Sequence, residues 1–258
     1  MFLSMKHLSF YIIFHKDIYQ ENTSSFSEET TKKFLKWVAV NEKIPKQYPL
    51  WIPTECLIKE WEMTIHSPLY QMLNFYQNST FLHLFWNKEH EKSKYIGFGQ
   101  YDMSFDSAEF EKMDNVLKTT EDTVYGAFIY AFTAILPSYP YELLQYMFLT
   151  PYNEFYGTAH TFDKLKEMPL FLLHTFIIPS WFFKHMMPFI EKNIPHILRI
   201  FQWDTRHLAG TLERIFALCI ACGMLEGKLR NILPLPGVKE KHEHRTEDSF
   251  RGISTGTI

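Results

Sequence analysis

Polar side chains follow a predicted strand in "YIGFGQYDMSFD", residues 95–106, where glycines replace the bulky residues typical of this chain. Gly97 and Gly99 are followed directly by Gln100, Tyr101 and Asp102. Glycine lets a backbone approach a neighbour closely, and ligands of open α/β sheets bind outside the carboxyl ends of the strands. The segment therefore predicts a ligand site in which the glycines leave room for the ligand. A strand that simply ends in a turn is the alternative.

A second group of charged side chains lies in "QWDTRHLAGTLERIF", residues 202–216. Asp204, Arg206 and His207 crowd a loop that leads into a helix, and Glu213 follows near the start of that helix. An arginine in such a loop can form paired hydrogen bonds with a phosphate group. The alternative is that Glu213 and the arginine after it only solvate or brace the helix.

Strands and helices alternate along the predicted chain. Apolar runs rich in aromatic or β-branched residues predict buried strands in "LSFYIIFH", "YIGFG" and "PLFLLHTFIIPS". Helical spacing or cap signals predict helices in residues 27–40, 107–120, 181–193 and 208–225. This order predicts a three-layer α/β domain over residues 1–235, followed by a polar, flexible tail over residues 236–258.

Composition excludes several classes of protein. The 258 residues are 46% hydrophobic and 17% aromatic, which is typical of a globular chain, and a net charge of −3 argues against a nucleic-acid partner. Three cysteines cannot all pair, and Cys219 and Cys222 lie in an apolar run typical of a core helix. The first residues carry no cleavage site, and the longest apolar runs are shorter than the roughly 20 residues of a membrane span. We therefore expect a cytoplasmic protein without a membrane span.

Separated segments resemble one protein family in their order along the chain. They are "YIIFHKDIY", "YIGFGQYDM", "FIIPSWFFKHMMPFIE" and "GTLERIFALCIA", within roughly residues 8–225. They resemble nucleotide-sugar glycosyltransferases of capsular-polysaccharide loci and large DNA viruses, which carry a His-Lys pair, a Gly-x-x-His-Tyr-Arg-Arg-like motif, a strand like "FIIP" and an "ERLF"-like helix. Gln100, Asp102 and Met103 stand where the commoner pattern has His, Arg and Arg.

The resemblance implies a GT-A-like, Rossmann-like fold: a mixed, mainly parallel sheet flanked by helices, with a helical C-terminal part and the nucleotide at the carboxyl ends of the strands. It implies a hexosyl- or pentosyltransferase that moves a single sugar from a nucleotide-sugar donor, a UDP-sugar, to a carbohydrate or glycoprotein acceptor in glycan or polysaccharide assembly. The residues do not choose between inverting and retaining transfer, and we expect an inverting one.

The resemblance and the residue types together assign roles to residues. The expected donor site consists of His15, Lys16, Gln100, Tyr101, Asp102, Arg206 and His207. Glu213, in the family's Glu-Arg pair, is the expected base that removes the proton of the acceptor hydroxyl, and Asp204 is the second candidate. His174, Thr175 and Trp181 are expected on the acceptor side. The alternative for His174 and Thr175 is a pair of satisfied polar groups in the core.

Asp102 is also the candidate ligand of a divalent metal, Mn²⁺ or Mg²⁺. Hard divalent ions prefer several oxygen ligands, so a site with this one carboxylate would depend on the phosphates of the donor. The alternative function is a non-catalytic carbohydrate- or protein-binding module on a glycosyltransferase-like fold. The departures at Gln100, Asp102 and Met103 favour that alternative.

Overall fold

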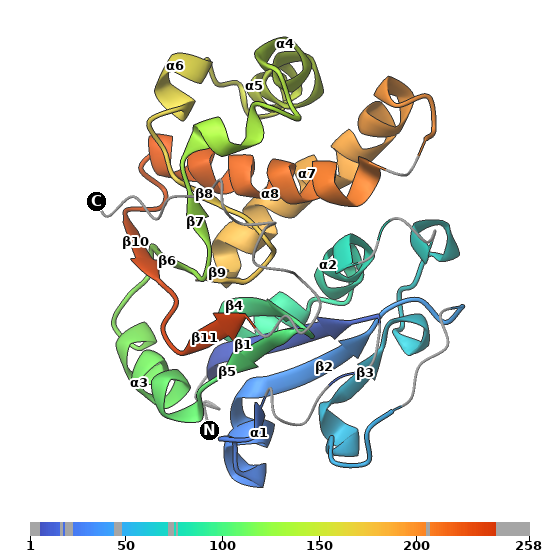
Figure 1. Ribbon diagram of the computed structural model, residues 1–258, viewed down its shortest axis with the longest axis vertical. Helices are drawn as coiled ribbons and strands as arrows, with labels where there is room; N and C mark the ends of the chain where they lie inside the picture. The colour runs from blue at the N-terminus through green and yellow to red at the C-terminus, as the bar shows by residue number, and fades with distance from the viewer. Residues whose placement is uncertain are drawn as a thin grey trace.

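Seven strands form one sheet in the computed structural model, which describes residues 6–15, 18, 23–43, 48–71, 75, 77–204 and 207–240 (Figure 1). In spatial order they are β10 (Asn231–Pro234), β6 (Thr123–Gly126), β9 (Phe176–Pro179), β4 (Ser93–Gln100), β1 (Lys6–Phe14), β2 (Leu35–Ala39) and β3 (Leu57–Lys59). Only β9 runs antiparallel to its neighbours in this described sheet. The carboxyl ends of the parallel strands and the amino end of β9 therefore share one edge, here called the carboxyl edge.

Helices cover both faces of the sheet (Figure 1). The helices on one face are α2 (Gln77–Trp86), α7 (Ser180–Ile200) and α8 (Leu208–Leu225), and those on the other are α1 (Glu28–Phe34) and α3 (Ser107–Leu117). Phe98 of β4 packs on Phe183 of α7 with ring centroids 5.5 Å apart, whereas Phe10 of β1 packs on Phe110 of α3 at 4.9 Å. This arrangement confirms the predicted three-layer α/β architecture.

Smaller elements complete the fold. The helices α4 (Tyr141–Leu144) and α5 (Thr150–Tyr156) are joined by a π-helical turn (Gln145–Leu149), and α6 (Phe162–Leu165) follows them. Two small antiparallel sheets pair β5 (Met103–Phe105) with β11 (Val238–Glu240), and β7 (Ile129–Tyr130) with β8 (Leu170–Phe171). Residues 238–240 of the predicted flexible tail thus form a strand, and residues 241–258 lie outside the described residues.

The glycines of β4 make room for an aromatic ring of the core. A Cβ atom at Gly97 would lie 2.4 Å from Cδ2 of Phe10, which is its partner on β1, and 2.8 Å from Cγ1 of Ile177. At Gly99 a Cβ would lie 2.5 Å from Cζ of Phe105. The expectation that these glycines leave room for a ligand is therefore wrong, because the core of the protein fills that space.

Some predicted elements change type within the structure. The helix predicted over residues 27–40 begins as expected, with the Ser27 side chain accepting a hydrogen bond from the Thr30 N–H at 3.2 Å. It ends at Phe34, and the chain continues at once as β2, which pairs with β1. Asp106, which follows β5, caps α3 by accepting hydrogen bonds from the N–H groups of the first turn.

One helix of the described chain, α8, is long and apolar enough to cross a membrane by length and composition. Of the 18 residues of this helix, 67% are buried inside the protein. Cys219 and Cys222 are among its buried residues. The burial is that of a core helix, as the sequence around the two cysteines predicts.

Gly97→Ala should lower the free energy of unfolding by about 1–3 kcal/mol, because the added methyl group collides with the Phe10 ring. Urea unfolding of the two proteins measures the difference. In a Phe10→Ala background the ring is gone, so the same substitution should cost clearly less. Equal costs in both backgrounds would show that the ring does not impose glycine here.

Candidate functional site

Residues predicted to bind the donor meet at the carboxyl edge of the sheet. His15 directly follows β1, Gln100 ends β4, and Tyr101 and Asp102 form the turn after it. The rings of His15 and Tyr101 contact each other edge to face, with centroids 5.0 Å apart. These four residues, which are partly exposed, come together because β1 and β4 are parallel neighbours. Lys16 and Arg206 lie outside the described residues.

The backbone of Leu173, just before β9, is held by a side chain of β4, one of α8 and one of the same connection. Its carbonyl oxygen accepts hydrogen bonds from Gln100 Nε2 at 2.6 Å and from Thr175 Oγ1 at 3.1 Å. Its N–H donates to Oε1 of Glu213, on α8, at 3.2 Å. Three residues predicted for different parts of the site thus converge on one residue at the carboxyl edge.

Leu173 and His174 both adopt the left-handed region, with φ angles of 62° and 47°. For bulky residues this conformation is strained and persists only where surrounding contacts hold it. The hydrogen bonds to Leu173 supply such contacts. They also explain why the predicted strand "PLFLLHTFIIPS" is divided into β8 and β9.

His174 is a core residue. Its ring is 2% exposed and stacks on Phe81 at 4.8 Å, with Phe216 at 5.2 Å. Burial, together with the nearby Arg214 charge, lowers the pKa of His174 to about 3, so the ring is neutral near pH 7. Its two buried ring nitrogens have no hydrogen-bond partner among the described residues. His174, like the buried Thr175, offers no surface to an acceptor in this structure.

Glu213 and Arg214 form an ion pair on α8, with Arg214 Nη1 lying 3.3 Å from Glu213 Oε1. The Glu213 and Arg214 side chains are 12% and 27% exposed. Nη1 also donates to the Gly210 carbonyl at 3.0 Å, and the guanidinium lies over the Tyr139 ring at 5.6 Å. The buried Nε of Arg214 has no hydrogen-bond partner among the described residues. Arg214 is thus a fixed, partly exposed cation, which the sequence suggested only as a brace for its helix.

Other predicted site residues lie apart from this cluster. Trp181 is in the first turn of α7, after the carboxyl end of the antiparallel β9, and so at the edge opposite the carboxyl edge. Its Nε1 donates to the Glu121 carbonyl at 2.9 Å. Asp204 and His207 lie in the connection between α7 and α8, where the His207 ring is 6.1 Å from that of Phe201.

The residues described do not fit a metal centre built by the protein alone. No group of three His, Cys, Asp or Glu side chains within the described ranges is arranged to hold a metal ion. Asp102 supplies one carboxylate, fewer oxygen ligands than a hard divalent ion requires. Asp106, the nearest acidic residue in the sequence, caps α3 instead.

Two further features lie away from the cluster. A cavity of about 530 Å³ beside the edge strand β3 is lined by residues that include Lys36, Lys59 and Glu62, and by no residue of the predicted site. A fully buried pair, Glu60 and His83, joins Oε1 to Nδ1 at 2.7 Å. Because neither side chain of this pair is exposed, it stabilises the loops after β3 rather than contacting a ligand.

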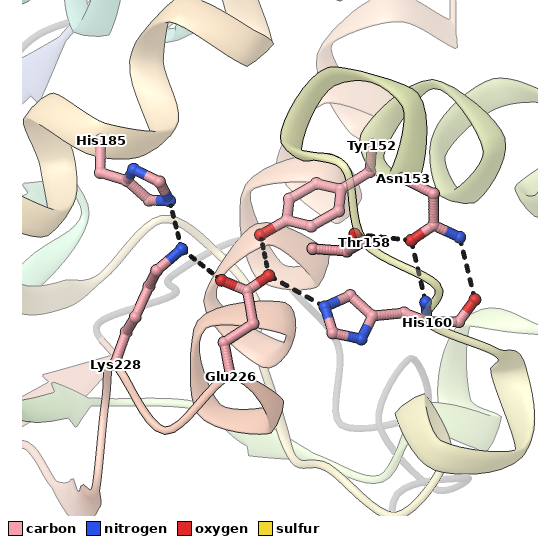
Figure 2. A network of polar contacts seen from close by, with 7 residues as sticks. All are labelled: Tyr152, Asn153, Thr158, His160, His185, Glu226 and Lys228. Atoms are coloured by element: carbon pink, nitrogen blue, oxygen red, sulfur yellow. Dashed lines mark hydrogen bonds and ion pairs between the residues drawn. The ribbon is translucent and has the colours of Figure 1, made fainter.

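A polar network that the sequence did not suggest surrounds Glu226 at the carboxyl end of α8 (Figure 2). Glu226 accepts hydrogen bonds from Tyr152 at 3.0 Å, from His160 at 2.9 Å and from Lys228, whose Nζ also contacts His185. Burial alone would raise the pKa of Glu226, but the hydrogen bonds from these three groups outweigh it and lower the pKa. The network ties α5 and α7 to α8 at the edge opposite the cluster.

Comparisons with known proteins support the fold. No protein-family model matches the sequence, and no curated protein matches it. Among solved structures, the apo form of WbbM, a bifunctional glycosyltransferase, is similar with a TM-score of 0.58 and 14% sequence identity. The match covers 91% of this chain and 45% of WbbM, so the chain spans less than half the length of that protein. The similarity confirms the predicted fold class, a mixed, mainly parallel sheet flanked by helices as in a glycosyltransferase.

Acid should destabilise the fold through His174. The unfolded chain protonates this residue near its ordinary pKa of 6.5, whereas the folded protein does so only near pH 3. The neutral ring therefore makes its full contribution to the free energy of unfolding above pH 6.5. This contribution is lost as the pH falls toward 3, by at most about 1.4 kcal/mol per pH unit. Urea unfolding at several pH values measures this slope. In His174→Asn, which tolerates the left-handed backbone, the slope should be smaller; an unchanged slope would contradict the assignment.

Proposed function

We propose that this chain is a glycosyltransferase that binds a nucleotide-sugar donor, a UDP-sugar, at the carboxyl edge and transfers its sugar to a carbohydrate or glycoprotein acceptor. The observation that carries the proposal is the Glu213–Arg214 pair, a carboxylate and a guanidinium fixed side by side at this edge. The fold shared with a glycosyltransferase supports it. Glycan or polysaccharide assembly, which the resemblance to glycosyltransferases of capsule loci and viruses implies, is the proposed context of the reaction.

Arg214 is the proposed cation for the donor diphosphate. When the sugar leaves, negative charge develops on the diphosphate, and a positioned guanidinium stabilises it. Arg214 is partly exposed, and its contacts with Gly210 and Tyr139 fix its position before a ligand arrives. Lys16 and Arg206, which the sequence assigns to the same task, are further candidates. We assign no step to a metal ion, because the described residues do not form a metal centre.

Glu213 is the proposed base of an inverting transfer. The acceptor hydroxyl oxygen forms a bond to the anomeric carbon of the sugar as the bond from that carbon to the diphosphate breaks. The hydroxyl proton passes to the Glu213 carboxylate, and the diphosphate leaves with the electron pair. The hydrogen bond from the Leu173 N–H orients this carboxylate. Asp204, in the connection before α8, remains the second candidate.

His15, Gln100, Tyr101 and Asp102 are the proposed contacts of the nucleotide. The edge-to-face pair of His15 and Tyr101 is the proposed surface for the nucleobase. Asp102, in the turn after β4, is the proposed acceptor of a hydrogen bond from a ribose hydroxyl. The side-chain amide of Gln100 already donates a hydrogen bond to the Leu173 carbonyl. Its proposed role is therefore to position the site rather than to bind the donor.

One observation favours a second candidate function, a non-catalytic carbohydrate- or protein-binding module. Glu213 Oε1 already accepts hydrogen bonds from Leu173 and Arg214, as a purely structural carboxylate would. Such a module would bind a saccharide or a protein and would transfer no sugar. Measurements of donor binding and of turnover separate the two functions.

Donor binding should depend on Arg214. Isothermal calorimetry with UDP and a panel of UDP-sugars should detect binding to the wild type, and Arg214→Gln should weaken it by about tenfold or more because a charge-assisted contact is lost. Arg230→Gln is the matched control, since Arg230 is 75% exposed and pairs with Asp122 elsewhere on the molecule. The same titrations of Asp102→Asn, with manganese and with a chelator, separate a ribose contact from a metal ligand. Absence of any nucleotide binding would favour the binding module.

Turnover should depend on the charge of Glu213. Glu213→Gln keeps an oxygen that can accept from the Leu173 N–H, so the fold and the donor affinity should remain, while turnover falls by about 100-fold or more. Product formation with a donor that binds, together with the melting temperature, measures both effects. A lower melting temperature with normal activity per folded molecule would show that Glu213 is structural. Asp204 would then become the proposed base.

A further inference from the structure

Trp203 is held on the surface by a strained backbone. Its side chain is 63% exposed, and its φ angle of 64° follows a φ of 51° at Gln202. A bulky residue in the left-handed region is a conformational outlier, and here two such residues are consecutive. Strain of this kind occurs often at functional sites, so the placement of the indole needs an explanation.

The end of α7 explains the conformation of Gln202 alone. The Gln202 N–H donates to the Arg199 carbonyl at 3.0 Å, and the Trp203 N–H donates to the Leu198 carbonyl at 2.8 Å. This is the pattern of a helix end at which glycine usually takes the left-handed position. Trp203 adds a second left-handed residue after it, and the Asp204 N–H then donates to the Phe201 carbonyl at 2.8 Å. The turn thus directs a large apolar ring outward at a cost in stability.

The two most exposed tryptophans of the described chain differ in how they are held. The Trp181 indole donates to the Glu121 carbonyl and packs against Phe182. The Trp203 indole has no hydrogen bond or ring contact with any residue that the structure describes. Trp203 therefore presents both an open ring face and an open N–H to a ligand.

We propose that Trp203 is the stacking platform for a sugar ring of the acceptor. A sugar presents an apolar face of C–H groups and a rim of hydroxyls, which suits an exposed indole with polar neighbours. Gln202 and His207 are also exposed, and Gln202 and Asp204 adjoin Trp203 in the chain, so polar groups that can bond to sugar hydroxyls lie in this segment. The identity of this sugar as an acceptor rests on the proposed glycosyltransferase function.

The position of Trp203 agrees with that role. The connection that carries it leads directly into α8, which begins at Leu208 and presents Glu213 about 7.5 Å further along the helix axis. In this proposal an acceptor of two or three sugar units on Trp203 extends along the start of α8 toward the carboxylate proposed to take its proton. Trp203 replaces Trp181 as the aromatic contact of the acceptor, because Trp181 lies at the opposite edge of the sheet.

The test separates strain from ligand binding. Trp203→Gly relieves the left-handed strain, so the melting temperature should stay equal or rise. Its affinity for disaccharides should fall by about tenfold or more, because a stacking face is lost. Lys88→Gly is the matched control: it relieves left-handed strain at an exposed residue before the amino end of β4 and should leave saccharide affinity unchanged. Trp203→Phe, which retains an aromatic face, should retain most of the affinity, and Trp181→Ala should have no effect.

The probes are lactose, cellobiose and chitobiose, with affinities measured by saturation-transfer NMR. The proposal is overturned if none of the three binds the wild type, if Trp203→Gly binds as the wild type does, or if Trp203 instead governs binding to phosphatidylglycerol vesicles. Calorimetry with UDP on the same variants keeps the two proposals distinguishable. Saccharide binding that depends on Trp203 without any nucleotide binding would refute the transferase and leave the platform intact. Nucleotide binding and turnover with unchanged saccharide affinity in Trp203→Gly would refute the platform alone.

Discussion

The hydrogen bonds to the backbone of Leu173 are the contacts on which the arrangement of the carboxyl edge depends. Gln100 reaches this residue from the sheet, Glu213 from the helical layer, and Thr175 from the residue just before β9. Because they hold Leu173 and His174 in a conformation that bulky residues avoid, the chain can turn sharply between β8 and β9. That turn leads the chain into β9, which runs antiparallel between β4 and β6.

Local signals in the sequence were sufficient for part of the fold. The strands β1 and β4 and the helices α3 and α8 are apolar or amphipathic runs with clear ends, and they form where the sequence predicts them. The change from helix to strand at Leu35 has no glycine or proline to mark it, since it is imposed by pairing with β1. The break at Leu173 likewise depends on side chains far away in the sequence. Gly97 was misinterpreted for the same reason, because the ring that requires it comes from another strand.

Prediction of the candidate site from the sequence was limited in the same way, by contacts between residues that are distant in the chain. Sequence spacing and family resemblance selected Gln100, Thr175 and Glu213, which the structure brings together, but not the shared backbone contact that joins them. Residue type alone could not reveal that His174 is sealed in the core, or that Trp181 lies at the opposite edge because β9 is antiparallel. Arg214 resembled an ordinary charge on a helix, and only its contacts with Tyr139 and Gly210 distinguish it.

Carboxylates fix α8 at both of its ends: Glu213 joins it to Leu173 near one end, and the Glu226 network joins it to α5 and α7 at the other. Each residue of an α-helix turns by about 100°, so inserting or deleting one residue between these anchors would rotate one carboxylate away from its partners. Side chains on α8 can therefore vary during evolution more freely than its length can. Length variation in related chains should instead accumulate in the loops that lead into and out of this helix.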